Sequence, residues 1–521
     1  MQICFHRQDN HGRTGSEENP RCRFFFAIIE PLSVVKLTPT LSLSHVYQRN
    51  GYTPPHSQYR KFVVGIDKFF KITERGSTIK TELLGGVTTF LTMAYIIVVN
   101  PAILAFAGFP EGPTTVATIL AAVLGCLLMG LYANRPIAVA PYMGENAFIA
   151  FGLAALGIGW QQRLGAVFLS GLAFLALSVF RLRPWLANSI SPSLKYSFAA
   201  GIGLFLTFIG LYQVGIVTSA AKGMPVDALQ IQGSSLLGAP PVPLKIGDWH
   251  DPKVLLAIFG FIVTCALLDR KVKGAVLIGI VLTSVIGVVL GYGEAPTGVF
   301  AMPFTGEYTL EPIFLKLDVV SALQVSFLPI LVTLFLMSFL DTLATLIGVG
   351  AAGNMLDEKG NFEDIEKPMV VDAISCVSSS LIGTSTSGAY IESAAGIREG
   401  ARTGFATVIT ALLFFASLFF LPLVTPFQKL SYAYAPALMA VGILMLHSLK
   451  QIDMDDLTEA VPAISTIALM IFTYNTANGL TAGLVLFVLM KIASGRWKEL
   501  NSGSYVLAAM CLVYFFFGLP H

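Results

Sequence analysis

The chain has 521 residues, of which 55% are hydrophobic and only 12% are charged, whereas soluble domains carry about 25% charged residues. Its mean hydropathy of +0.72 excludes an ordinary soluble globular protein, because so much apolar surface needs lipid to cover it. The formal net charge of +2 leaves no surplus of cations for nucleic acid. We therefore expect a multi-pass membrane protein, with lipid rather than nucleic acid around it.

Residues 1–62 differ from the rest of the chain. They are rich in Arg, Asn, Ser and Pro, and their apolar run 24–29 ends at Glu30, which is too short for the core of a signal peptide. We interpret them either as a disordered cytoplasmic extension or as residues that precede the true start of the protein. The intact mass of the native protein distinguishes these two interpretations.

From Glu82 onward, apolar segments alternate with short polar breaks, and about 20 helical residues cross the hydrocarbon core. The predicted segments are 83–106, 114–132, 138–156, 164–182, 193–215, 252–268, 274–291, 320–348, 369–383, 387–398, 404–424, 430–448, 458–474 and 479–493. Several are too short to cross alone, which favours broken helices shielded inside the protein. A further apolar stretch, 503–519 within the C-terminal segment 494–521, has no assigned placement.

The basic residues indicate the orientation. If residue 80 lies in the cytoplasm, twenty of the Lys and Arg residues from Lys61 onward fall on the inner side and six on the outer side. Such a bias is typical of membrane proteins, whose cytoplasmic loops are enriched in Lys and Arg. We expect a multi-pass protein of the cell (plasma or inner) membrane with a cytoplasmic N-terminus.

Short stretches in the first half of the sequence resemble stretches in the second half at a nearly constant offset. The run 144–147 (GENA) resembles 391–394 (IESA) at an offset of 392 − 145 = 247, and Pro192 matches Pro436 at 436 − 192 = 244. About seven segments lie between matching points, an odd number, so the halves must run in opposite directions through the bilayer. We predict an all-α polytopic fold of about fourteen segments in two inverted repeats, 63–291 and 320–493, as in many secondary transporters.

Substrate sites of such transporters lie where Gly- or Pro-interrupted apolar segments occupy corresponding positions. Here these segments are 140–148 and 383–393. Each begins with residues that favour extended backbone and then becomes helical, which leaves free backbone donors near the membrane centre. An irregular backbone at that depth must line a polar cavity.

Three carboxylates lie inside apolar segments, at Glu145, Asp341 and Glu392. A central Asp costs roughly 2.5–3.5 kcal/mol on insertion scales, so such residues mark functional sites. The alternative for each is a neutral carboxyl that bonds another helix, and it is strongest for Glu145 because Asn146 can supply that polar contact. We interpret four further acids at segment ends as interfacial: Glu82, Asp269, Asp318 and Asp372.

No basic residue lies among these segments to neutralise the acids, so burial favours a protonated carboxyl near neutral pH. A carboxylate accepts N–H bonds from a neutral heterocycle and a carboxylic acid donates, so Asp341, Glu392 and Glu145 are candidates to couple proton and ligand movement. Asn146 offers both a donor and an acceptor. Three aromatic residues are candidates to stack on a planar ring, although ordinary packing is the simpler explanation for each of them: Phe339, Tyr390 and Phe148.

Five stretches carry a resemblance to a known family. They are TELLGGVTTFLTMAYIIVVNPA (81–102), MGENAFIAF (143–151), FLDTLATLIGVG (339–350), GTSTSGAYIESAAGIREGARTG (383–404) and FTYNTANG (472–479). From about residue 66 to residue 496 the chain resembles the AzgA-like purine permeases, a branch of nucleobase-cation symporter family 2 in the nucleobase-ascorbate transporter superfamily.

The resemblance implies a core domain of segments 1–4 and 8–11 and a gate domain of segments 5–7 and 12–14, with short antiparallel strands in segments 3 and 10. It implies proton-coupled uptake of hypoxanthine, guanine or adenine, and often a homodimer formed through the gate domain. The family's binding Asp of segment 8 falls on Asp341, its Glu of segment 10 on Glu392, and its Asn of segment 3 on Asn146. No cofactor is implied.

The chain departs from the family at one motif. The branch commonly has Gly-Met-Gly-x-Asn-Ala, whereas this chain has Tyr142 at the first position and Glu145 at the fourth. Both residues alter the wall or the charge of the expected site, so they bear on which purine it prefers.

Two other classes of protein compete with a nucleobase transporter. An enzyme is disfavoured because the chain has neither H-E-x-x-H nor G-x-S-x-G, and its one G-x-G-x-x-G, at 348–353, follows no strand. The six cysteines show no paired spacing for a disulfide framework or a metal cluster. An anion transporter or channel of related architecture is the alternative to a nucleobase symporter, but three central acids argue against anions.

Overall fold

The structure is a computed structural model that describes residues 64–180, 185–186, 188–224, 243–296, 298–353, 355, 362 and 364–517. The N-terminal extension 1–62 lies outside the described residues, so both interpretations of it remain predictions.

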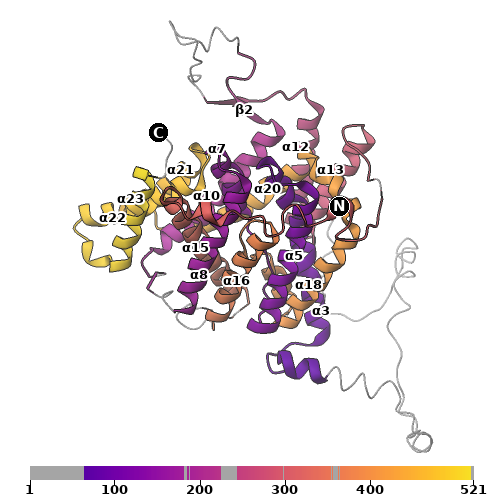
Figure 1. The fold of residues 1–521 in the computed structure, drawn as a ribbon, viewed down its shortest axis with the longest axis horizontal. Helices are drawn as coiled ribbons and strands as arrows, with labels where there is room; N and C mark the ends of the chain where they lie inside the picture. The colour runs from indigo at the N-terminus through magenta and orange to yellow at the C-terminus, as the bar shows by residue number, and fades with distance from the viewer. Residues whose placement is uncertain are drawn as a thin grey trace, which may run out of the picture. The chain divides into compact units, whose positions relative to one another are not determined.

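Helices form most of the described chain (Figure 1). In the first half they are α3 (Ile79–Met93), α4 (Ile96–Phe106), α5 (Glu111–Leu128), α6 (Met143–Ala147), α7 (Leu153–Ala155), α8 (Trp160–Val179), α10 (Pro192–Val214), α12 (Pro252–Asp269) and α13 (Ala275–Val289). In the second half they are α14 (Val319–Ala322), α15 (Leu328–Ala352), α16 (Glu366–Ile382), α17 (Ser393–Arg398), α18 (Gly404–Ser417), α19 (Leu421–Gln428), α20 (Ser431–Met445), α21 (Leu457–Phe472), α22 (Thr476–Ala493) and α23 (Ser502–Phe517).

Within the described ranges, 9 helical stretches are long and apolar enough to cross a membrane. Three shorter apolar helices accompany them, in α13, α21 and α23. The predicted segments 138–156 and 387–398 instead consist of a short strand followed by short helical pieces. The polytopic helical membrane fold is confirmed, and its third and tenth segments are broken as expected.

Local sequence explains where the long helices begin and end. Helix α10 begins at Pro192, after Ser191, whose hydroxyl accepts a bond from the Leu194 N–H, as is usual for N-caps. Helix α16 ends at Gly383, whose φ of +106° is one that residues with a Cβ rarely adopt. That ending frees the chain to continue into the second broken segment.

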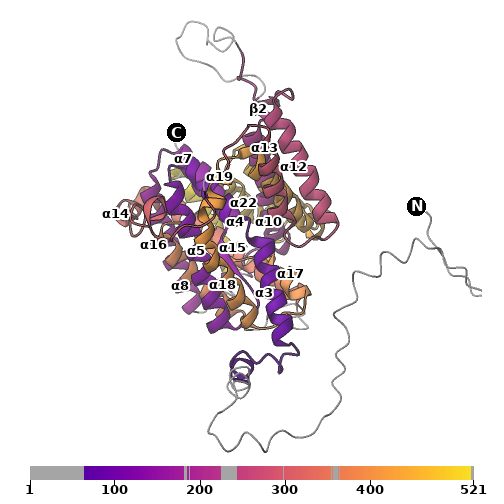
Figure 2. The same ribbon diagram turned by 90° about the vertical axis from the view of Figure 1, so that its right-hand side faces the viewer.

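The long helices form two groups by their packing. One group contains α3, α4, α5, α8, α15, α16, α17 and α18, and the other contains α10, α12, α13, α20, α21 and α22. Helices far apart in sequence lie side by side within each group, such as α5 with α18 and α12 with α20 (Figure 1, Figure 2). In the second group, α10 and α20 approach through Gly203 and Gly442, where an added Cβ would lie 2.3–2.5 Å from the opposing carbonyl oxygen; small residues permit such contacts between membrane helices.

A two-stranded antiparallel sheet joins the two broken segments. Strand β1 (Val139–Pro141) pairs with β4 (Ser387–Ala389), so that Val139 faces Ala389, Ala140 faces Gly388 and Pro141 faces Ser387. Every residue of both strands is buried. The expected strands of segments 3 and 10 are confirmed, and a second small sheet, β2 (Val217–Ser219) with β3 (Leu244–Ile246), lies elsewhere.

Glu82 lies in the first turn of α3, at the end of its segment, and is buried within the protein. Its carboxylate accepts bonds from the backbone N–H groups of Arg402 (2.8 Å), Thr403 (3.3 Å) and Ala406 (3.3 Å). These donors lie at the start of α18, where unpaired N–H groups favour an anion. The sequence gives no sign that Glu82 caps the start of α18, because its partners are 320 residues or more away along the chain.

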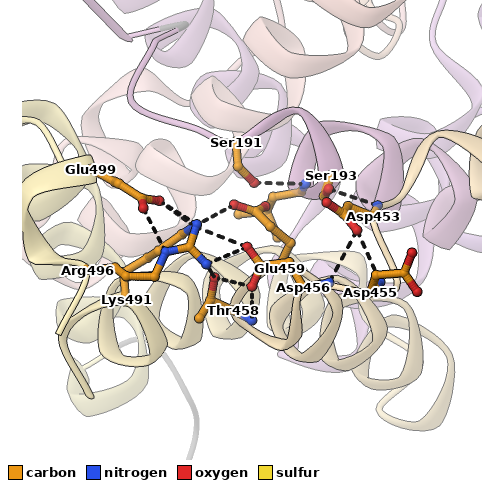
Figure 3. Close-up of polar contacts among 11 residues, drawn as sticks. Ser191, Ser193, Asp453, Asp455, Asp456, Thr458, Glu459, Lys491, Arg496 and Glu499 are labelled. Carbon is orange, nitrogen blue, oxygen red and sulfur yellow. Dashed lines mark hydrogen bonds and ion pairs between the residues drawn. The ribbon is translucent and has the colours of Figure 1, made fainter. Parts of the chain in front are cut away.

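A cluster of ion pairs joins the ends of α21 and α22 (Figure 3). The side chain of Lys491 is only 4% exposed and its ammonium lies 3.0 Å from Glu459 and 2.8 Å from Glu499. Arg496 lies 2.6 Å from Asp456 and 2.7 Å from the same Glu499. The cluster therefore fixes the short helix Trp497–Glu499, which precedes α23, onto the ends of both helices.

This cluster predicts a loss of stability in acid. Bonds from Thr458 and Arg496 lower the pKa of Asp456 to about 2, and bonds from Arg496 and Lys491 lower the pKa of Glu499 to about 2. The stabilisation is present above the ordinary carboxyl pKa of about 4 and is lost as the pH falls from there toward 2. In detergent, the unfolding temperature of Glu499→Gln should lie below that of the unmodified protein at neutral pH, and the difference should vanish near pH 2. A difference that does not change with pH would contradict this assignment.

Candidate functional site

Six elements surround one set of acidic side chains. Strand β1 and helix α6 come from the first broken segment, β4 and α17 come from the second, and α15 and α16 pack beside them. The break between α3 and α4, at Ala94 and Tyr95, lies against the same site through the side chain of Tyr95.

Asp341 lies near the middle of α15, between the buried residues Leu340 and Thr342. Its own side chain is partly exposed, and no described residue donates a hydrogen bond to its carboxylate. Asp372 and Glu392 are close enough to interact with it electrostatically. The Asp341 carboxylate is therefore a hydrogen-bond acceptor without a donor among the described residues.

Glu392 precedes α17 and is partly exposed like Asp341. Its carboxylate accepts a bond of 2.7 Å from the Tyr95 hydroxyl. Tyr390 lies close enough to both Asp341 and Glu392 to interact with them, and its hydroxyl bonds the carbonyl oxygen of Pro141. The second broken segment thus brings an acid and an aromatic side chain next to Asp341.

Glu145 and Asn146 lie on α6, and both are completely buried. One carboxylate oxygen of Glu145 accepts a bond of 2.9 Å from Ser338 of α15. Asn146 donates through its side-chain N–H to the side-chain oxygen of Asn100, a buried residue of α4 that also donates to Thr118 at 2.7 Å. Asn100 was not singled out from the sequence, because a lone amide in an apolar run carries no pattern.

Asp372 is also a member of this site, so its interpretation as interfacial is wrong. Helix α16 begins at Glu366, earlier than the predicted 369, so Asp372 lies in its second turn and is completely buried. One of its oxygens accepts from the Tyr142 hydroxyl at 3.1 Å and from the Ala389 N–H at 3.0 Å. The Tyr142 hydroxyl also lies 2.8 Å from Thr342, the residue after Asp341.

Two of the three predicted aromatic residues lie within packed surroundings. Phe339 is fully buried between Phe174 and Phe335, with ring centroids 6.2 and 6.3 Å away. Phe148 is buried against Gly152, where an added Cβ would lie 2.6 Å from its ring. Tyr390 is the aromatic residue that the structure places beside the acids.

The arrangement can bind a neutral ligand with N–H donors and can hold protons. Four acids gather where two broken segments meet, and two of them are accessible. Across the described ranges, no group of 3 or more His, Cys, Asp and Glu side chains is placed to hold a metal ion. A polytopic helical fold with buried acids at its broken segments is that of a membrane transport protein.

Comparison with known sequences gives the family. A model of the xanthine/uracil permeases, described as "Permease family", matches residues 80–482, and the chain belongs to this family. A putative permease of Methanocaldococcus jannaschii is 42% identical over 86% of this chain and 98% of its own length. The guanine/hypoxanthine permease PbuG of Bacillus subtilis is 38% identical (86% and 99%), and the adenine permease AdeQ of Escherichia coli is 37% identical (85% and 95%). The chain is therefore a permease and not an enzyme.

Comparison with solved structures supports the fold. The transmembrane domain of the cyanobacterial bicarbonate transporter BicA matches with a TM-score of 0.53 and 18% identity, over 78% of this chain and 97% of that one. The murine anion transporter Slc26a9 in its inward-facing state matches with a TM-score of 0.56 and 13% identity, over 87% and 74%. At such identities the similarity is one of fold alone.

Proposed function

We propose that the protein imports purine nucleobases together with protons. The observation that carries this proposal is Asp341, a partly exposed carboxylate at the middle of α15 that receives no hydrogen bond from the described residues. The N–H groups of a neutral purine are donors of the kind that such an acceptor binds. Relatives named as adenine and guanine/hypoxanthine permeases support the same class of substrate.

In this proposal each residue near Asp341 has a defined task. Glu392 supplies a second acceptor, and the ring of Tyr390 stacks against the planar base. Asn146 reads the base through its amide oxygen, which has no partner among the described residues. Side chains that are already fixed before the base binds lose little further entropy, which favours affinity.

We propose that transport proceeds by alternating access. The two helix groups correspond to a core domain of segments 1–4 and 8–11 and a gate domain of segments 5–7 and 12–14, and their separate packing supports this division. The core carries purine and proton past the steadier gate, with bending near 348–353, at the C-terminal end of α15, and near 400–404, between α17 and α18. The N-terminal side of α3 is cytoplasmic in this proposal, and the gate domain forms any homodimer.

The alternative of an anion transporter draws only on fold, since the two solved structures compared above are titled a bicarbonate transporter and an anion transporter. No basic side chain hydrogen-bonds or ion-pairs with the four acids among the described residues, and an anion would be repelled there.

Uptake of radiolabelled hypoxanthine into cells that express the protein tests the proposal. We expect accumulation that a protonophore abolishes and that excess unlabelled guanine or adenine reduces. A competition panel of nucleobases would rank the substrates. Sulfate or chloride flux without purine uptake would overturn the proposal.

A further inference from the structure

Three acids of the described chain are completely buried, and they differ in how their oxygens are satisfied. Both oxygens of Glu82 accept bonds from backbone N–H groups. Asp372 receives two bonds on one oxygen, and its other oxygen has no partner. Glu145 receives one bond, from Ser338, and its second oxygen is likewise buried without a partner.

This series indicates which acid is least stable as an anion. A buried charge without hydrogen bonds costs several kcal/mol, roughly 1–3 kcal/mol or more for each unsatisfied polar atom. Glu82 gains three backbone donors at a helix N-terminus, so both of its oxygens are satisfied. Glu145 accepts a bond from the Ser338 hydroxyl, has the neutral hydroxyl of Thr386 nearby and has no described cation. A proton on its unpartnered oxygen removes part of this cost.

The surroundings of Glu145 strengthen this preference. The titratable groups that face it are Asp341 of α15 and Asp372 and Cys376 of α16. An ionised Glu145 would add a second or third negative charge to the same site, and like charges at short distance favour protonation. When a purine donates its N–H groups to Asp341, it stabilises the Asp341 anion and so favours a proton on Glu145.

We infer that Glu145 carries the coupled proton, while Asp341 and Glu392 hold the purine. This inference rests on the proposed function and assigns proton binding and purine binding to different acids. The core moves in one direction with a purine bound and Glu145 neutral. It returns empty after Glu145 has released that proton. The proton is bound from one side of the membrane and released to the other, with no bond of the purine changed.

The inference predicts that Glu145→Gln separates movement from coupling. With one coupled proton, a gradient of one pH unit supports about tenfold accumulation of purine in proteoliposomes. The glutamine is always neutral, so purine–purine exchange should remain while accumulation falls to a ratio of about 1. Glu82→Gln is the control, because Glu82 is the other fully buried glutamate of the described chain and lies outside the acidic site. The Glu82→Gln protein that reaches the membrane should still accumulate purine about tenfold.

The outcomes separate this inference from the proposed function. Tenfold accumulation by Glu145→Gln, or loss of exchange together with accumulation, would overturn the inference. Absence of purine transport by the unmodified protein would overturn the proposed function instead.

If Glu145→Gln is not recovered in the membrane, Ser338→Ala gives a second test. Removing the hydroxyl that bonds the Glu145 carboxylate at 2.9 Å should let proton-coupled uptake persist to more alkaline pH, and an unchanged pH profile would contradict the inference.

Discussion

Asp341→Asn should reduce purine uptake by about a hundredfold while leaving the protein in the membrane. The asparagine keeps the size of the side chain but offers one acceptor in place of two and loses the negative charge. A hydrogen bond to a charged group is worth roughly 1.5–3 kcal/mol, so losing one or two of them gives this magnitude. Uptake of labelled hypoxanthine, normalised to the amount of protein in the membrane, measures the effect.

Asp269→Asn is the matched control for this change. Asp269 lies at the exposed end of α12, so the same substitution there removes a charge without touching the site. Glu392→Gln should lower uptake in the same direction as Asp341→Asn, since Glu392 supplies the second acceptor. Full uptake by both site variants would show that the purine binds elsewhere.

Gly388→Ala should impair the protein through a steric clash at the strand pair. An added Cβ at Gly388 would lie 2.1 Å from the hydroxyl oxygen of Tyr142 and 2.3 Å from its ring. Overpacking of this kind costs about 1–3 kcal/mol, and here it would displace a hydroxyl that bonds Thr342 and Asp372. We expect uptake to fall by roughly tenfold to a hundredfold, with a lower unfolding temperature in detergent.

A second substitution tests the cause of this defect. Tyr142→Ala removes the atoms that clash, so the double variant should unfold at a higher temperature than Gly388→Ala alone. Gly65→Ala is the control, because an added Cβ at Gly65 has nothing within 4 Å. If the losses from Gly388→Ala and Tyr142→Ala simply add, the two residues are not in the contact that the structure shows.

Sequence patterns predicted most of the helical fold. Runs of apolar residues marked α10 and α12 closely, because lipid imposes a length on every crossing segment. The broken segments were also predictable, since Pro141 and the Gly and Ser residues of 383–388 disfavour a continuous helix. The pairing of β1 with β4 came from the family resemblance, since backbone pairing across about 250 residues leaves no periodic signal.

The site was predicted only in part, because burial depends on distant partners. Asp341, Glu145 and Glu392 stand out within apolar runs, whereas Asp372 lies near a segment end and becomes buried only when α16 packs on α5 and α8. The bond from Tyr142 to Asp372 joins residues 230 positions apart. Such contacts follow from tertiary packing, which hydropathy does not describe.

Purine accumulation in proteoliposomes under an imposed pH gradient tests the central claim most directly. Purified protein is reconstituted, the interior is made alkaline relative to the outside, and labelled hypoxanthine is added externally. The account predicts inward accumulation above the external concentration that collapses when a protonophore dissipates the gradient. Equal purine concentrations on both sides with and without the gradient, or entry of labelled sulfate in place of purine, would contradict it.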